Sequence, residues 1–272
     1  MKQQTMPSGT PFSGTQTPRA IHEALLSLSA GNQLSDSTFF AIDNWLSATV
    51  MAALTADVTA MTPSVLCPYA RLLTLAAQWT EGRQPAVPAP GLLERRMETA
   101  LRRLTDALRT ADGAEERYRL AEAALDLRAA LRPVNDAAMQ AIADSLLTAG
   151  ESGGLAPHLR AAFLFRRHLL YGCPADLKES TATAARLARN TDGSNGQDIT
   201  DVLYELAPLC ESDTAGILPR AEDTALSALA GTAANSPVAD TADSLRRTCL
   251  VFACLERHSV CRYQDVFLEA MA

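Results

Sequence analysis

Residues 92–110, LLERRMETALRRLTDALRT, decide the fold class of this chain. Their apolar residues recur at spacings of three and four, which places them on one face of an α-helix. These residues are Leu93, Met97, Leu101, Leu104 and Leu108. Charged residues fill the other faces, so the segment predicts an amphipathic helix that packs against neighbours.

The segments on either side predict further helices. Residues 114–131 form a second helical segment that stops before Pro133, and residues 134–149 form a third that ends at Gly150. Short links favour antiparallel neighbours. Strand-type alternation is absent from the sequence. The remaining expected helices cover about 18–29, from a Ser35 or Ser37 cap to Leu54, 63–79, 155–171, 175–190, 198–210, 219–231, 240–258 and a short stretch from Tyr263. The sequence therefore predicts an all-α protein, an irregular multi-helix bundle or an α/α layered array of about ten to twelve helices.

The predicted domain organisation is a tail followed by one helical domain. Residues 1–17 are polar and rich in Gly, Ser, Thr and Pro, which indicates a disordered tail. Residues 18–272 are expected to form a single all-α domain. The Pro-rich linker GRQPAVPAPG, residues 82–91, is interpreted as an exposed connection within that domain, because no change of composition follows it. A seam between two domains is the alternative.

Side chains on the apolar faces and runs predict one continuous core. These are Trp45, Leu73, Trp79, Leu101, Phe163, Leu203 and Phe252.

Charge and composition restrict the partners and the compartment. The net charge is -7 and the pI is about 5.2, which argues against nonspecific binding to nucleic acid or to an anionic membrane. No apolar run reaches the ~18–20 residues of a membrane span. The first residues lack the apolar centre of a signal peptide, so we expect a cytoplasmic protein. The only lysines are Lys2 and Lys178, a bias that we interpret as typical of a GC-rich bacterial genome.

The six cysteines are expected to be buried thiols of a reducing compartment. The alternative for three late residues is a metal site, since Cys254, His258 and Cys261 are spaced by four and seven and can share one side of a helix. No fourth ligand accompanies them, and the run CLVFACL at 249–255 is apolar all round. We therefore predict core packing there, no metal and no cofactor.

Ligand-binding candidates gather in FRRHLLYGCPADLKE, residues 165–179. The preceding helix is expected to end at Gly172 and the next to begin near Pro174, which leaves free amides that favour an anionic group. We predict that two of the candidates, His168 and Tyr171, face inward and line a cavity, and that a neighbouring arginine faces solvent. The candidates are Arg166, His168, Tyr171, Cys173 and Asp176.

Two interpretations of this segment stay open. In the first, His168 and Asp176 act as base and orienter for a Cys173 thiolate at a helix start. In the second, the segment is a Gly-terminated helix, a Cys cap and solvated arginines.

A separate group of acidic residues follows. Asp198, Asp201 and Glu205 are candidates for a carboxylate pair that faces inward. The chain has no Glu-x-x-His partner motif, which argues against a diiron site.

Three segments resemble, in order and spacing, an uncharacterised all-helical bacterial domain family of unknown function. They are HLLYGCPAD (168–176), DITDVLYELAPL (198–209) and RRTCLVFACL (246–255), and AIDNWL (41–46) is similar to the family's opening. The family's threonine before the histidine is Arg167 in this chain. The resemblance covers about half of the chain and implies an all-helical fold, with no activity attached.

The sequence leaves the choice between enzyme and binding protein open. The leading hypothesis is a noncatalytic helical module of a bacterial cytoplasmic pathway that binds a protein or peptide. The alternative is a metal-independent enzyme or binding protein that acts on a small metabolite in an interhelical cavity. A thiolate metal site is a third class. No nucleic-acid or membrane partner is expected.

Overall fold

The computed structural model describes residues 36–80, 90–131, 136–190, 199–210 and 242–257. Within these ranges there are nine α-helices and no strand, which confirms the all-α prediction, although ten to twelve helices were expected. The predicted helices at about 18–29, at 219–231 and from Tyr263 lie outside the described residues, as do the tail 1–17 and most of the linker 82–91. None of the described helices combines the length and apolarity that crossing a bilayer requires.

The described helices run in chain order, with a single 3₁₀ turn, η1 (Val58–Ala60), after the first of them. They are α2 (Asp36–Thr55), α3 (Pro63–Thr80), α4 (Pro90–Thr110), α5 (Ala114–Leu131), α6 (Ala137–Glu151), α7 (Pro157–Tyr171), α8 (Pro174–Asn190), α9 (Ile199–Cys210) and α11 (Ala242–Arg257).

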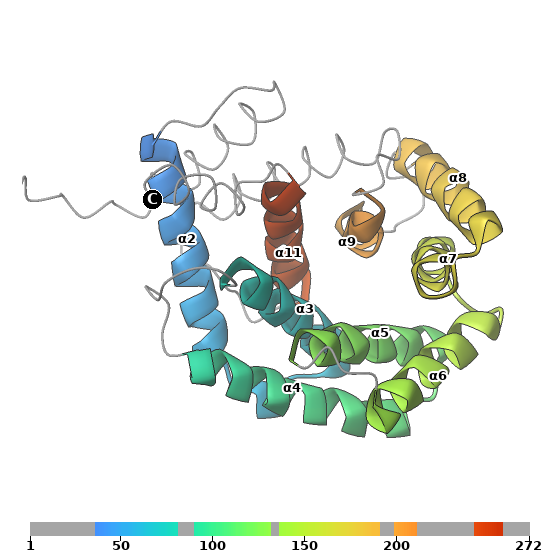
Figure 1. Cartoon of the computed structure of the whole chain (residues 1–272), viewed down its shortest axis with the longest axis horizontal. Coiled ribbons are helices and arrows are strands. Elements are labelled where there is room, and N and C mark those ends of the chain that lie inside the picture. The colour runs from blue at the N-terminus through green and yellow to red at the C-terminus, as the bar shows by residue number, and fades with distance from the viewer. Residues whose placement is uncertain (1–35, 81–89, 132–135, 191–198, 211–241, 258–272) are drawn as a thin grey trace, which may run out of the picture.

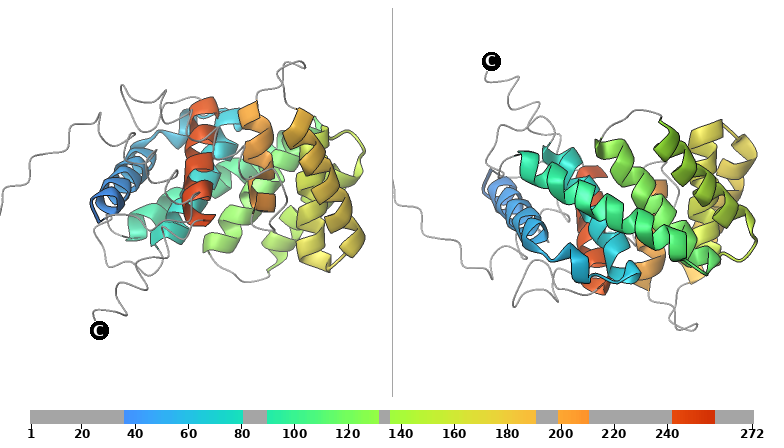
Figure 2. Two further views of the ribbon diagram at one scale, coloured as in Figure 1. Left: turned by 90° about the horizontal axis from the view of Figure 1, so that it is seen from above. Right: turned by 90° about the horizontal axis from the view of Figure 1, so that it is seen from below.

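Helix α5 lies at the centre of the arrangement. It packs against α3, α4 and α6, while α11 packs against α3 and α9. At one end of the molecule α7 pairs with α8, and α2 lies at the other end (Figure 1). Figure 2 shows α9 and α11 side by side, next to α3. Four helices, α3, α5, α9 and α11, are therefore brought together although they are far apart in the sequence.

The buried apolar side chains form one cluster that reaches from Val50 on α2 to Cys254 on α11. Four predicted core residues are buried, which confirms that part of the prediction: Leu73, Phe163, Leu203 and Phe252. Trp45 and Leu101 are partly buried and pack against the same cluster. The Trp79 side chain lies outside the described part of the structure.

A glycine fixes the approach of α6 to α7. A Cβ atom at Gly150 would lie 2.2 Å from the Phe163 ring, so no larger residue fits without displacing that ring. The Gly150 carbonyl accepts a hydrogen bond from Arg160 Nη1 at 2.8 Å. Phe163 in turn packs edge-on against Tyr118 of α5, with the ring centroids 6.2 Å apart. These contacts hold α7 beside the centre of the fold.

Candidate functional site

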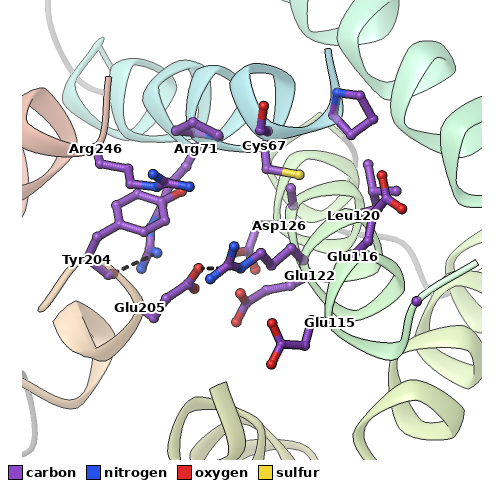
Figure 3. A pocket seen from close by; sticks show the side chains of 16 residues that line it. Cys67, Arg71, Glu115, Glu116, Leu120, Glu122, Asp126, Tyr204, Glu205 and Arg246 are labelled. Atoms are coloured by element: carbon purple, nitrogen blue, oxygen red, sulfur yellow. Dashed lines mark hydrogen bonds and ion pairs between the residues drawn. The ribbon is translucent and has the colours of Figure 1, made fainter. Parts of the chain in front are cut away.

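A cavity of about 420 Å³ lies between α3, α5, α9 and α11. Figure 3 shows charged side chains that enter it from all four helices. The residues that matter for its chemistry are Arg71, Arg119, Glu122, Tyr204, Glu205 and Arg246. Eight of its sixteen lining residues are charged, which is more than the few polar groups of an ordinary ligand pocket.

The anionic wall comes from α5. Between Tyr118 and Leu127 helix α5 is buried on most sides, because its own alanines and leucines lie on several faces, and Glu122 is buried among them. Arg166 of α7 binds both oxygens of Asp126, at 2.6 Å and 3.0 Å. The same guanidinium donates to Glu122 Oε1 at 3.2 Å, and the Tyr118 hydroxyl is 3.0 Å from that oxygen. One arginine thus serves two carboxylates.

A second set of ion pairs joins α5, α9 and α11. Arg119 Nη2 donates to Asp201 Oδ2 at 3.1 Å, and its Nε lies 3.1 Å from Glu205 Oε1. Arg246 Nε lies 3.2 Å from Asp201 Oδ1. His158 Nε2 is 3.7 Å from Asp201 Oδ2. Buried charges are tolerated only when they are paired in this way.

Arg71 is held differently from the other arginines. Its guanidinium lies over the Tyr204 ring, 4.6 Å from the centroid, and its Nη1 donates to the Tyr204 carbonyl oxygen at 3.0 Å. Among the residues that the structure describes, no carboxylate lies within ion-pair distance of Arg71. The stacking and the hydrogen bond fix its orientation toward the cavity, and the acidic groups Glu122, Glu205 and Asp126 act on its charge only from beyond ion-pair distance.

Burial shifts the protonation of several groups at the cavity. Burial and the nearby Glu122 carboxylate raise the pKa of Glu205 to about 8, against the opposing effect of Arg119. Burial raises the pKa of the Cys67 thiol to about 12, so this thiol stays protonated and is no nucleophile at neutral pH. Burial also lowers the pKa of His158. The cavity is therefore equipped for recognising charge rather than for thiol chemistry.

The predicted segment 165–179 has the expected backbone. Helix α7 ends at Tyr171, Gly172 caps it in the left-handed conformation at φ 66°, and α8 begins at Pro174. These boundaries confirm the prediction. The left-handed cap requires glycine because a Cβ atom is disfavoured there.

The side chains of this segment do not converge on the charged cavity. Arg166 turns to α5, as described above. Arg167 binds Asp176 with two hydrogen bonds, at 2.6 Å and 2.8 Å, so Asp176 is held by an arginine and not by His168. His168 Nδ1 lies 2.8 Å from the Cys173 carbonyl oxygen. These contacts clamp the turn between α7 and α8.

Tyr171 is 60% exposed, so the prediction that it faces inward is wrong. The Gly172 cap ends the helix beyond the packed part of α7, and the last turn projects into solvent. Leu169 and Leu170 of the same turn are 66% and 48% exposed. His168 is half-buried, as is Cys173. A ligand role for these residues stays a prediction.

The prediction of buried thiols is confirmed for three of the four cysteines whose side chains the structure describes, and the fourth, Cys173, is half-buried. Cys67, Cys249 and Cys254 are buried. Of the metal-site alternative, only Cys254 lies in the described part of the chain, because His258 and Cys261 fall outside it. Among the described residues, no group of three or more His, Cys, Asp or Glu side chains is arranged to hold a metal ion.

Sequence reasoning found part of the charged cavity. It named Asp201 and Glu205 as candidates for an inward-facing carboxylate pair. Glu205 is 3% exposed and lines the cavity, whereas Asp201 is partly buried and contacts Arg119, His158 and Arg246. Asp198 lies outside the described residues. The arginines that neutralise this pair were missed, as was Glu122. The available signal was the charge on a helix with no polar face, since acidic residues within AEAALDL (121–127) must find interior partners.

Comparisons with known proteins add no family to this picture: no protein-family model, no curated protein and no solved structure matches the chain. The resemblance to an uncharacterised helical family therefore stays a prediction. Function has to be argued from the geometry of the chain itself.

Proposed function

We propose that this protein binds a small polar metabolite in the cavity between α3, α5, α9 and α11. The observation that carries the proposal is Arg71, a cation that lines the cavity, is oriented by Tyr204, and has no carboxylate partner among the described residues. Of the two functions that the sequence left open, the geometry favours the small-metabolite alternative over the protein- or peptide-binding module.

The dimensions of the cavity support this proposal. Its volume of about 420 Å³ falls within the roughly 300–1,000 Å³ typical of small-molecule sites. Titratable groups with shifted pKa values gather at functional sites, and Glu205 is such a group at this cavity. The charges come from four helices, so the site is held by the packing of the fold and not by a loop.

The test is ligand-observed NMR of the full chain against a panel of cationic, anionic, zwitterionic and neutral polar metabolites. We expect a subset of the panel to bind. The variant Ala123→Leu fills the cavity, because Ala123 lines it and is largely buried. Its matched control is Ala130→Leu, an exposed position on the same helix. Binding should be lost in the first variant and kept in the second.

Two results would overturn the proposal. One is a folded wild-type protein that binds no member of the panel. The other is binding that survives Ala123→Leu unchanged, because the bound molecule would then lie elsewhere on the protein. The melting temperature of each variant shows whether it is folded.

A second candidate function, the binding of a protein partner, is favoured by the end of α7. Leu169, Leu170 and Tyr171 are consecutive, apolar or aromatic, and exposed. Runs of exposed apolar residues are usually avoided unless they serve an interaction. Photo-crosslinking from position 169 in the native host should yield a discrete adduct that is absent when the probe is placed at Ala130. Equal patterns at both positions would remove this candidate.

A further inference from the structure

We infer that the ligand of this cavity is a small zwitterion, an amino-acid-like molecule whose carboxylate binds Arg71 and whose ammonium group binds Glu122. The inference rests on the proposed function and deepens it by naming the chemical class. It is argued from the charges that the protein leaves without a full partner.

Charges of both signs line the cavity, and apart from the paired Arg119 and Glu205 they are unevenly distributed. Arg71 comes from α3 and Arg246 from α11, whereas Glu115, Glu116 and Glu122 all come from α5. Figure 3 shows Arg71 and Arg246 gathered at one side with Tyr204, and Glu115 and Glu116 at the opposite side. A ligand that spans this space therefore meets positive charge at one end and negative charge at the other.

The internal ion pairs use up most of the remaining charges. Arg119 and Arg246 face Asp201 and Glu205, two cations against two carboxylates. Both guanidinium groups of this set therefore already have acidic partners within the protein. The charges of the cavity that a ligand could neutralise must therefore lie outside this group.

The positive charge without an ion-pair partner is that of Arg71. Its one hydrogen bond goes to a backbone carbonyl and its ring partner is neutral, so the guanidinium keeps a full charge. A guanidinium presents a planar set of donors that matches a carboxylate. Because the Tyr204 contacts already fix its orientation, a carboxylate can bind Arg71 at little cost in side-chain entropy.

The negative charge without a full partner is that of Glu122. Arg166 is shared between Asp126 and Glu122, so one positive charge faces two carboxylates. Both known contacts of Glu122, from Tyr118 and Arg166, go to Oε1, and no described residue bonds its second oxygen. Glu122 is only 9% exposed and lines the cavity. An ammonium group placed there gains a charge-assisted hydrogen bond to a carboxylate that solvent barely reaches.

A ligand with a single charge fits less well. A simple anion satisfies Arg71 but lies in the field of the α5 carboxylates, and a simple cation satisfies Glu122 but faces Arg71 and Arg246. A zwitterion places a charge of the opposite sign next to Arg71 and next to Glu122 at the same time. The raised pKa of Glu205 agrees with an excess of negative charge near Glu122, which is one of its causes.

The test compares four five-carbon probes by isothermal titration calorimetry: norvaline and δ-aminovalerate, which are zwitterions with close and distant charges, and valerate and pentylamine, which carry one charge each. We expect at least one zwitterion to bind the wild-type chain at least about tenfold more tightly than either single-charge probe, since each charged hydrogen bond gives about tenfold or more.

Two variants separate the two ends. Arg71→Met should weaken the binding of the zwitterion and of valerate by about tenfold, and it should not weaken the binding of pentylamine, whose charge Arg71 repels. Glu122→Gln should weaken the binding of the zwitterion and of pentylamine, and it should not weaken the binding of valerate, whose charge Glu122 repels. The Gln amide oxygen can still accept from Tyr118 and Arg166, and the melting temperature checks that the variant is folded. Matched controls are Arg96→Met and Glu98→Gln on α4, outside the cavity.

The outcomes distinguish the two levels of the argument. If a single-charge probe binds as tightly as the better zwitterion and Ala123→Leu abolishes its binding, the zwitterion inference is wrong and the proposed function stands. If the folded chain binds neither these probes nor any member of the metabolite panel, both fail; if panel members bind in the cavity but no zwitterion does, only the zwitterion inference fails. If zwitterion binding ignores Arg71→Met and Glu122→Gln, the assignment of the two ends is overturned.

Discussion

The charged cavity and the α7–α8 junction use the same residue types in opposite ways. At the junction, Arg167 and Asp176 are nine residues apart and neutralise each other through two hydrogen bonds. At the cavity, the charges come from helices far apart in the chain and leave Arg71 and Glu122 incompletely matched. Charged residues that are close in sequence can neutralise one another completely. Charged residues brought together by packing can leave some charges without a full partner and available to a ligand.

The largest expected effect is at Arg166, which joins the two regions. It belongs to the predicted segment but binds the α5 carboxylates, and its side chain is 19% exposed. Arg166→Met should lower the free energy of unfolding by about 3–5 kcal/mol, because Asp126 and Glu122 lose their shared cation in a buried setting. Urea denaturation followed by circular dichroism measures this loss.

A rescue experiment sharpens this prediction. Adding Asp126→Asn to Arg166→Met removes one of the two stranded carboxylates and should recover part of the lost stability. A loss of less than about 1 kcal/mol for Arg166→Met would place this ion pair with ordinary surface pairs. The contrast between the interior network at Arg166 and the local clamp of Arg167 and Asp176 would then fail.

At the junction the expected effect is smaller and purely structural. Arg167→Met should cost about 1.5–3 kcal/mol, the usual range for hydrogen bonds to a charged group, because Asp176 is buried and loses both bonds. Binding of the δ-aminovalerate probe should not change in the folded variant. Calorimetry that shows weakened binding with unchanged stability would move the site to the junction.

The local elements were predictable because their signals are local. The amphipathic stripe of residues 92–110 became α4, and the second predicted helix, 114–131, became α5 with the same limits. The Gly172 cap and Pro174 start followed from backbone preferences that need no tertiary information. Asp201 and Glu205 were candidates for an inward-facing pair, and their separation of four residues puts them near one face of a helix.

The cavity was not predictable because its residues meet only through packing. Arg71 and Tyr204 are 133 positions apart, and nothing near either residue indicates the other. The Tyr171 prediction failed for a related reason. Helical spacing puts His168 and Tyr171 near one face, but the chain turns at Gly172 and leaves the last turn of α7 without a neighbour over Tyr171 in the described structure.

The third prediction concerns how the stability of the protein depends on pH through the charged cavity alone. The folded pKa of Glu205 is about 8, above its ordinary value of 4.5, because burial and Glu122 favour the protonated acid. The unfolded state releases this proton first as the pH rises. The contribution of the protonated Glu205 side chain to the free energy of unfolding is therefore fully present below about pH 4.5 and is lost as the pH rises through 8.

The matched variant Glu205→Gln isolates this effect. Between these two pH values, the stability of the wild type should fall relative to Glu205→Gln by up to about 1.4 kcal/mol per pH unit, the limit for one proton. Urea denaturation at several pH values measures the difference. His158, whose pKa is lowered by burial, changes stability in the opposite sense at lower pH, and it does so in both proteins. If the free energies of unfolding of the two proteins change in parallel with pH, Glu205 is ionised in the folded protein and its negative charge is fully compensated by the surrounding cations.

The smallest expected effect is at Tyr171, on the exposed end of α7. Because this side chain is 60% exposed, Tyr171→Ala should change the free energy of unfolding by no more than about 0.5 kcal/mol. Zwitterion binding should also be unchanged, since Tyr171 does not line the cavity. Tyr118→Phe is the contrasting variant: it removes a buried hydroxyl that is bonded to Glu122 and should cost about 1 kcal/mol. If Tyr171→Ala is the more damaging of the two in thermal denaturation, the end of α7 is packed in solution. In that case the junction carries more of the fold than its exposed side chains indicate.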